Sequence, residues 1–432
     1  MQPITQYKST RREMLQLAAA GGLSFGYTSW LDTLASRVSA APVLSSSQHK
    51  KAKACILIWL SGGPSHKDMF DLKPQSKGAG DFKPIATSAP GIQISEHLPK
   101  IAKLMNLGVL LRGMSTLEGA HPRASFNLHT GYREGQGGVV YPSLGSLVSS
   151  ELGKKDFAAP NYVAIGPRSY GSGFLGPKHQ PLQVAVPARG VEDLKSSVQQ
   201  NQFDQRVQLL EDMEKAFYGK YQSDIIQAHK TTYHRAVKLM ESKQSKAFDI
   251  SLEPQETQSQ YGKSAFGQGC LMARRLIEAS IPFVEVSLGG WDTHNDNFAR
   301  VKTLSATLDQ GMSALILDLK NRGLLSNTLV VCMGEFGRTP NINNRGAKPG
   351  RDHYPRAWSM LMMGAGVKHG MVYGKTDSEG ASVVEGKMSA MDFMATVCTI
   401  LGIDITKEIQ TPIGRPIRIV DKTAKVTHEI IA

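Results

Sequence analysis

Short apolar runs alternate along the chain with longer segments whose apolar residues return at a helical spacing. Residues 55–60 form a continuous apolar run that ends in Ser-Gly-Gly-Pro, which predicts a buried strand followed by a loop. Residues 298–319 keep one apolar face along the whole segment, which predicts a helix. Further strands are expected at residues 109–111, 162–165, 283–288, 328–333 and 360–363, and further helices at residues 97–107, 122–128, 266–280 and 391–401.

This alternation predicts an α/β fold with a doubly wound, mainly parallel sheet flanked by helices. Residues 166–192 are rich in glycine and proline and are expected to form a long ordered loop. The segment around residues 192–262 is polar and rich in Gln and Lys, and we interpret it as a helical insertion. Residues 50–432 are therefore expected to form a single domain, with ligands beyond the carboxyl ends of its strands.

The first 41 residues have the order of features that is typical of a twin-arginine export signal. Arg11 and Arg12 precede a weakly apolar stretch at residues 15–31, and small residues at 38–41 offer a cleavage site. The alternative is a chance arginine pair before an amphipathic helix. No segment reaches the length and apolarity of a membrane span, so the mature chain is expected to have none. We expect a periplasmic or extracellular protein.

The formal net charge of +13 changes this picture only slightly. The positive side chains are scattered and are not interleaved with aromatic residues, which argues against nucleic acid as a partner. An excess of Lys and Arg suits an enzyme for anionic esters or sulfated polymers, although it also serves solubility alone. The four cysteines form no C-x-x-C pair, and we interpret them as buried free thiols.

Candidate chemistry gathers where predicted strands end. Imidazole and carboxylate groups together suit Zn or Mn, and carboxylates alone suit Ca. Asp-x-His in an extended segment places both side chains on one side of the chain. The alternative is structural: an ion pair of Glu335 with Arg338, and a helix cap at Asp352. The candidate metal ligands are Asp68 after the first strand, with Asp71 as a substitute, then Asp292, His294, Glu335, Asp352 and His353.

These motifs resemble those of alkaline phosphatases and sulfatases. Residues 55–60 are similar to their first strand, which ends in a metal-binding acid, and residues 120–131 are similar to the sulfatase nucleophile helix. The resemblance implies that Asp292 and His294 bind one metal and that Glu335 is an acid of a second site. It also implies that His353, before Pro355 and a strand, is the last histidine ligand.

A narrower resemblance covers nearly the whole mature chain. The arginine pair, L-S-G-G-P-S-x-x-D-x-F-D-x-K-P at residues 60–74, G-G-W-D-T-H and G-E-F-G-R-T-P together resemble a sulfatase-like bacterial family of unknown function. The chain departs from the sulfatase pattern at the nucleophile, where His121 replaces Cys or Ser, and at Phe336, which replaces a histidine. Ser125 and Ser65 are the nearest hydroxyl groups that could act as a nucleophile.

The resemblance implies an alkaline phosphatase-like fold and an exported, metal-dependent hydrolase of phosphate or sulfate esters. Its cofactor would be a divalent ion (Zn, Mn or Ca), and its substrate a small anionic ester or a sulfated polysaccharide. We expect His121 to act as a ligand or general acid, Ser125 as the candidate nucleophile, and Arg338 as a clamp for an anionic oxygen. Two alternatives stay open: a catalytically degenerate protein that binds metal or polysaccharide, and a metal-dependent mutase or transferase.

Overall fold

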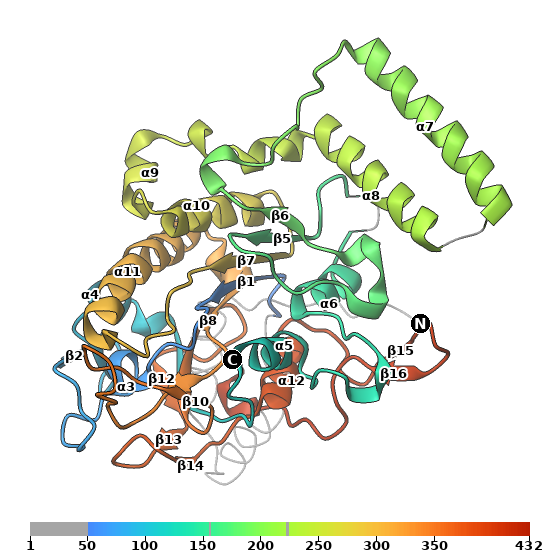
Figure 1. Cartoon of the computed structure of the whole chain (residues 1–432). Helices are drawn as coiled ribbons and strands as arrows, with labels where there is room; N and C mark the ends of the chain where they lie inside the picture. Colours follow the sequence, from blue (N-terminus) through green and yellow to red (C-terminus); the bar gives the residue numbers. More distant parts are fainter. Residues whose placement is uncertain (1–50, 155–156, 222–223) are drawn as a thin grey trace, which may run out of the picture. The chain divides into compact units, whose positions relative to one another are not determined.

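The computed structural model describes residues 51–154, 157–221 and 224–432, so the predicted export signal lies outside the described residues. An eight-stranded sheet forms the centre of the described fold (Figure 1). In spatial order its strands are β12 (Met371–Tyr373), β4 (Gly108–Met114), β11 (Trp358–Gly364), β8 (Thr328–Met333), β1 (Ala54–Trp59), β7 (Phe283–Ser287), β5 (Tyr162–Ile165) and β6 (Leu182–Val184).

The mainly parallel arrangement that the sequence predicts is confirmed. Only β11 runs antiparallel, to β4 on one side and to β8 on the other. Its reversal follows from the connection after β8, which stays at the carboxyl edge of the sheet and enters β11 from there. The residues just before β11 therefore lie at the same edge as the residues that follow β1, β7 and β8.

Side chains alternate between the two faces of each strand, and each face has its own apolar core. On one face, Ile56 and Ile58 pack into a core that includes α10 (Ala265–Glu278) and α11 (Asn297–Asn321). On the other face, Cys55 and Leu57 pack into a core that includes α6 (Leu144–Glu151) and α12 (Ala390–Ile400). Because β1 is buried on both faces, its sequence is a continuous apolar run.

The expected helix over residues 97–107 is wrong in length. Only α4 (Pro99–Ala102) is α-helical, and a 3-10 turn (Met105–Leu107) leads directly into β4. The backbone N–H groups of Lys100 and Ile101 donate to the carboxylate of Asp309, at 2.7–3.1 Å. This carboxylate of α11 accepts from backbone N–H groups that have no partner within the short helix.

The loop expected at 166–192 also contains β6, whose three residues gave no strand signal.

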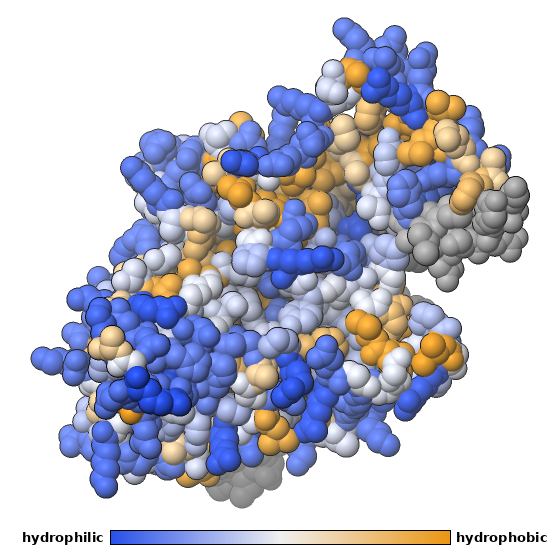
Figure 2. Space-filling view, in the orientation of Figure 1, coloured by the Kyte–Doolittle hydropathy of each residue, from blue (hydrophilic) through white to orange (hydrophobic). Residues whose placement is uncertain are grey.

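The polar segment does form helices, in the order α7 (Gln200–Tyr221), α8 (Asp224–Glu241) and α9 (Gln255–Tyr261). Figure 2 shows hydrophobic residues along α7 and α8 among hydrophilic ones, and Leu209 and Met213 of α7 are more than half exposed. No helix in the described ranges is long and apolar enough to cross a membrane. The remaining α-helices of the described chain are α3 (His66–Met69) and α5 (His121–Thr130). Outside the central sheet, the strands form the pairs β2–β3 (Pro84–Ala86, Gln93–Ser95), β9–β10 (Gly337–Arg338, His353–Tyr354), β13–β14 (Lys375–Thr376, Val383–Glu385) and β15–β16 (Glu408–Gln410, Pro416–Arg418).

Candidate metal centre

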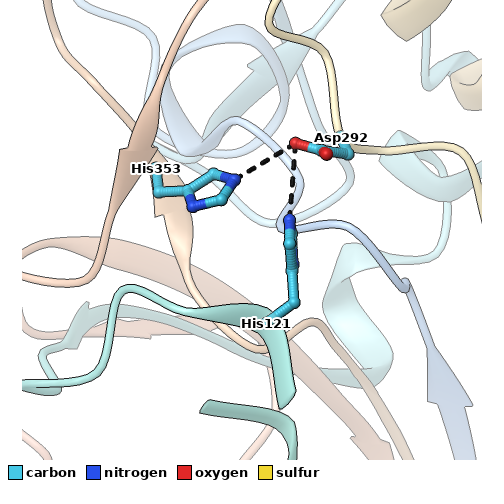
Figure 3. A group of neighbouring side chains, drawn as sticks. All are labelled: His121, Asp292 and His353. Atoms are coloured by element: carbon cyan, nitrogen blue, oxygen red, sulfur yellow. Dashed lines mark hydrogen bonds and ion pairs between the residues drawn. The ribbon is translucent and has the colours of Figure 1, made fainter. Parts of the chain in front are cut away.

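Three chain segments meet at the carboxyl edge of the sheet. Asp292 and His294 follow β7, and His121 is the first residue of α5, which follows β4. His353 is placed by the β9–β10 ladder, in which it pairs with Arg338. Figure 3 shows His121, Asp292 and His353 pointing toward one another from these separate segments. Their ligand atoms all lie within 4.8 Å of one another.

Three imidazole nitrogens converge on one carboxylate oxygen, Asp292 Oδ1. The Nε2 atoms of His294, His353 and His121 lie 3.1, 3.2 and 3.4 Å from it. The side chain of Asp292 is 46% exposed, so the cluster is open to solvent on one side. An open side leaves room for a water molecule or a substrate group beside the protein ligands.

The other nitrogen of each imidazole is held by a group that can only accept a hydrogen bond. His353 Nδ1 donates to the carbonyl oxygen of Gly119 at 2.8 Å, and His294 Nδ1 donates to Asp352 Oδ1 at 2.9 Å. His121 Nδ1 donates to Glu335 Oε1 at 2.5 Å. With Nδ1 protonated in each ring, the neutral form leaves its Nε2 lone pair unprotonated on the side of the cluster. Metal-binding histidines commonly have this partner on the second nitrogen.

Charges around the cluster shift its ionisation. Burial acts to raise the pKa of Asp292, but the hydrogen bond and charge of Arg338, together with His121 and His294, lower it to about 2. The hydrogen bond to Glu335 raises the pKa of His121. Burial lowers the pKa of His353, and the positive charge of Arg338 acts in the same direction.

Arg338 lies beneath the cluster and is fully buried. Its guanidinium donates to Asp292 Oδ1 at 2.5 Å and to the carbonyl oxygens of Gly62, Gly63 and Arg351. With its donors used inside the protein, Arg338 positions Asp292 and has no exposed face for an anionic substrate. The expectation of an anion clamp at this residue therefore has no support in the geometry.

Glu335 and Asp352, both expected as ligands, lie one layer behind the histidines. Glu335 is buried, and its Oε1 also accepts from the backbone N–H of Gly62 at 2.9 Å. Asp352 accepts from His294 and from Asn343 Nδ2, and its second oxygen pairs with Arg345. Both carboxylates orient histidines, a role that sequence spacing did not distinguish from ligation.

Asp68 lies apart from the cluster, in a buried ion pair. Its carboxylate accepts from Arg351 at 2.8 and 3.0 Å and from Asn297 Nδ2 at 2.8 Å. The backbone N–H of Arg351 donates to the carbonyl oxygen of Thr293, so the pair ties together the loops that carry His294 and His353. Asp71 is also buried, and it pairs with Lys73 and Arg112.

The two candidate hydroxyl groups do not join the cluster. Ser125 lies one turn after His121 on α5, its carbonyl oxygen accepts from His129 Nδ1 at 2.8 Å, and its hydroxyl lies against Tyr170. Ser65 is buried, and its hydroxyl has no hydrogen-bond partner in the described chain. Neither hydroxyl contacts Asp292 or one of the three clustered histidines in the ranges that the structure describes.

Phe336 fills the space beside two of the histidines. Its ring centroid lies 4.8 Å from that of His121 and 4.7 Å from that of His353. An apolar ring on this side restricts the number of ligands that can reach the cluster. Two supporting groups were not predicted from the sequence: Gly119, which accepts from His353, and Asn343, which donates to Asp352. A carbonyl oxygen and an isolated amide give no signal in a sequence.

Comparison with solved structures finds low similarity over most of the chain. PsFucS1 sulfatase from Pseudoalteromonas sp. is 13% identical, with 85% of this chain and 71% of that chain covered and a TM-score of 0.40. Ps i-CgsB in complex with k-i-k-neocarrahexaose is 14% identical, with 82% and 73% covered and a TM-score of 0.42. The alkaline phosphatase from the Antarctic bacterium TAB5 is 11% identical, with 83% and 100% covered and a TM-score of 0.39.

These likenesses are too low to carry an argument about the reaction. A search of curated proteins finds no match. The family model described as "Protein of unknown function (DUF1501)" matches residues 52–431, almost the whole described chain, and the chain therefore belongs to this family.

Proposed function

We propose that the chain is an exported, metal-dependent hydrolase of phosphate or sulfate esters. The observation that carries the proposal is the convergence of three Nε2 atoms on Asp292 Oδ1, at 3.1–3.4 Å, while each Nδ1 is held by an acceptor. Three imidazoles and one carboxylate form a donor set that fits Zn, and Mn as a second choice, better than Ca. His121, Asp292, His294 and His353 would hold the ion.

A divalent ion at this position would polarise an ester oxygen and lower the pKa of a bound water. The protein's own part is to hold the four side chains in place. Arg338 fixes Asp292, Glu335 fixes His121 and Asp352 fixes His294, each through the hydrogen bonds given above. No hydroxyl or thiol of the described residues lies among these groups, so we propose water as the nucleophile, without a covalent intermediate.

The substrate's anionic group has a place beside the cluster. A shallow depression is lined by His294, Asn295, Asn343, Arg345 and Asp352. The side chain of Arg345 is 74% exposed and pairs with Asp352, so it is free to exchange this contact for a phosphate or sulfate oxygen. We propose that Arg345 takes the role that the sequence assigned to Arg338.

One observation favours the second candidate, a protein of the same fold that has lost its catalytic function. Arg338 donates to the oxygen on which the histidines converge, at 2.5 Å, and therefore competes with a cation for Asp292 Oδ1. Phe336 also stands at the position where the resemblance to alkaline phosphatases and sulfatases implies a histidine of a second metal site. In this interpretation the positive charge of Arg338 takes the place of the charge of a metal ion, and the cluster only stabilises the fold.

Elemental analysis of the exported protein separates the two candidates. The wild type is compared with His353→Ala, and with His428→Ala as a control at an exposed histidine outside the cluster. We expect one equivalent of Zn or Mn in the wild type and the control, and less than about a tenth of it in His353→Ala. Metal-dependent turnover of p-nitrophenyl phosphate or p-nitrophenyl sulfate then supports the hydrolase.

Absence of metal from all three proteins, even after incubation with Zn and Mn, would contradict the proposal and favour the structural cluster.

Export is tested separately, by fractionation of cells that carry Arg11→Lys with Arg12→Lys. We expect the folded variant to be retained inside the cell, because the twin-arginine route reads both arginines.

A further inference from the structure

A pocket on the insertion side of the fold has a composition that the metal centre does not explain. Its walls come from α8, from the turn Pro177–His179 and from lining residues at positions 154 and 157–161, ahead of β5. Asn161 of this pocket directly precedes β5, so the pocket lies toward the amino end of that strand. The metal centre lies at the carboxyl edge, and the two sites share no residue.

Five cationic side chains line this pocket: Lys154, Lys178, Lys230, Arg235 and Lys238. None of the five forms an ion pair with a carboxylate of the described residues. Arg235 instead donates to the carbonyl oxygens of Pro177 and Gln180, at 2.9 and 3.4 Å, which fixes its position and leaves its charge uncompensated. Like charges gathered in one concave site repel one another and attract an anion.

The positive charges of the pocket also affect the pKa of the neighbouring His179. Burial lowers the pKa of His179, and the charges of Lys178 and Arg235 lower it further. Glu151 acts on the pKa of His179 in the opposite direction, but its carboxylate pairs with Lys407, and Glu211 lies 3.6 Å from His234. Neither carboxylate forms an ion pair with one of the five cations. The pocket thus presents more positive charge than the carboxylates of the described residues neutralise.

Other features of the wall suit a sugar better than a simple anion. The ring of Phe157 is half-buried, and the ammonium of Lys154 lies over it, 5.3 Å from its centroid. The rest of this ring and the side chain of Pro160 offer apolar surface, on which the C–H face of a pyranose ring can pack. Asn161 adds an amide group to the wall, which can form a hydrogen bond with a sugar hydroxyl. Inorganic sulfate or phosphate would use neither group.

We propose that this pocket binds a sulfated saccharide, with Lys230, Lys238 and Lys178 at its sulfate groups and Phe157 under a sugar ring. The site would hold a polymer at the insertion, apart from the metal centre. The proposal rests only on the pocket and does not require the chain to hydrolyse esters.

Calorimetric titration of the full mature protein with a heparin-derived hexasaccharide at 0.15 M salt tests the site. The double variant Lys230→Ala with Lys238→Ala is compared with Lys215→Ala with Lys243→Ala, which removes the same charge from the insertion outside the pocket. We expect the first pair to weaken binding by about tenfold and the second by less than about twofold. Phe157→Leu, which keeps the charge, is expected to weaken it by about fivefold.

Three controls decide the ligand class. The desulfated hexasaccharide should bind at least about tenfold more weakly, whereas the His353→Ala variant should bind the sulfated sugar as the wild type does. Equal losses in the two lysine pairs would overturn the proposal, because binding would then follow net charge alone. Tighter binding of phosphatidylglycerol vesicles or of single-stranded DNA than of the hexasaccharide would overturn it as well.

Discussion

The Nε2 atoms of His294 and His353 lie 2.9 Å apart, and each ring donates its Nδ1 hydrogen to a fixed acceptor. Two neutral rings held in this way would direct lone pairs at each other, which is unfavourable at this distance. A cation between them, either a proton on one ring or a metal ion, removes the repulsion. This contact links the loop after β7 to the ladder before β11 and is the geometric core of the proposed metal site.

Asp352→Asn is expected to lower the affinity for Zn by about 10–100-fold, because the amide orients His294 and raises its basicity less well than the carboxylate. Titration against a competing chelator measures this change. Asp212→Asn on the exposed face of α7 is the matched control and should leave affinity unchanged. Equal affinity in wild type and Asp352→Asn would show that this carboxylate does not support a ligand.

Arg338→Lys is expected to lower the free energy of unfolding by about 3 kcal/mol. A lysine cannot reach the oxygens of Asp292, Gly62, Gly63 and Arg351 together, so buried acceptors lose their partner. Urea unfolding measures the loss, with Arg206→Lys on exposed α7 as the control. A loss below about 1 kcal/mol would mean that the surrounding carbonyls find other donors.

Gly62→Ala is expected to disrupt the metal centre. Gly62 has φ of +115°, and an added Cβ would lie 2.4 Å from the backbone nitrogen of Asp292. Gly91→Ala isolates the backbone cost, since Gly91 has φ of +79° and no atom within 4 Å of its Cβ position. We expect about 1 kcal/mol of destabilisation at Gly91, and a larger loss together with loss of bound metal at Gly62. Urea unfolding of the two variants measures the losses of stability, and elemental analysis measures the loss of bound metal.

Arg274→Met tests the ion cluster that joins α10 to α11. The fully buried guanidinium lies 2.6 Å from Glu253, 2.8 Å from Glu278 and 2.9 Å from Asp318. Its removal leaves partly buried carboxylates without compensation and is expected to cost about 3 kcal/mol.

Arg322→Met is the control for the same cluster. Arg322 contacts Asp318 and Glu278 but is 36% exposed, so its removal should cost less than about 1 kcal/mol. Equal melting temperatures of the two variants would contradict the assignment of a structural role to the burial of Arg274.

Much of the sheet could be predicted because its strands are buried on both faces. A strand such as β1 must then be apolar throughout, and this leaves a clear signal in the sequence. Short elements left none: β6 has three residues, and α4 depends on the distant carboxylate of Asp309 for its first N–H groups. Tertiary contacts, which local patterns do not encode, determine such elements.

The sequence by itself determined the fold class, the main helices and the residue types available at the carboxyl edge of the sheet. Only the tertiary structure decided their roles. The reversal of β11 brings His353 to Asp292. Asp68 instead pairs with the buried Arg351, and Arg338 donates to Asp292 inside the protein. A side chain's role depends on which distant groups reach it within about 3 Å, and spacing along the chain does not specify those distances.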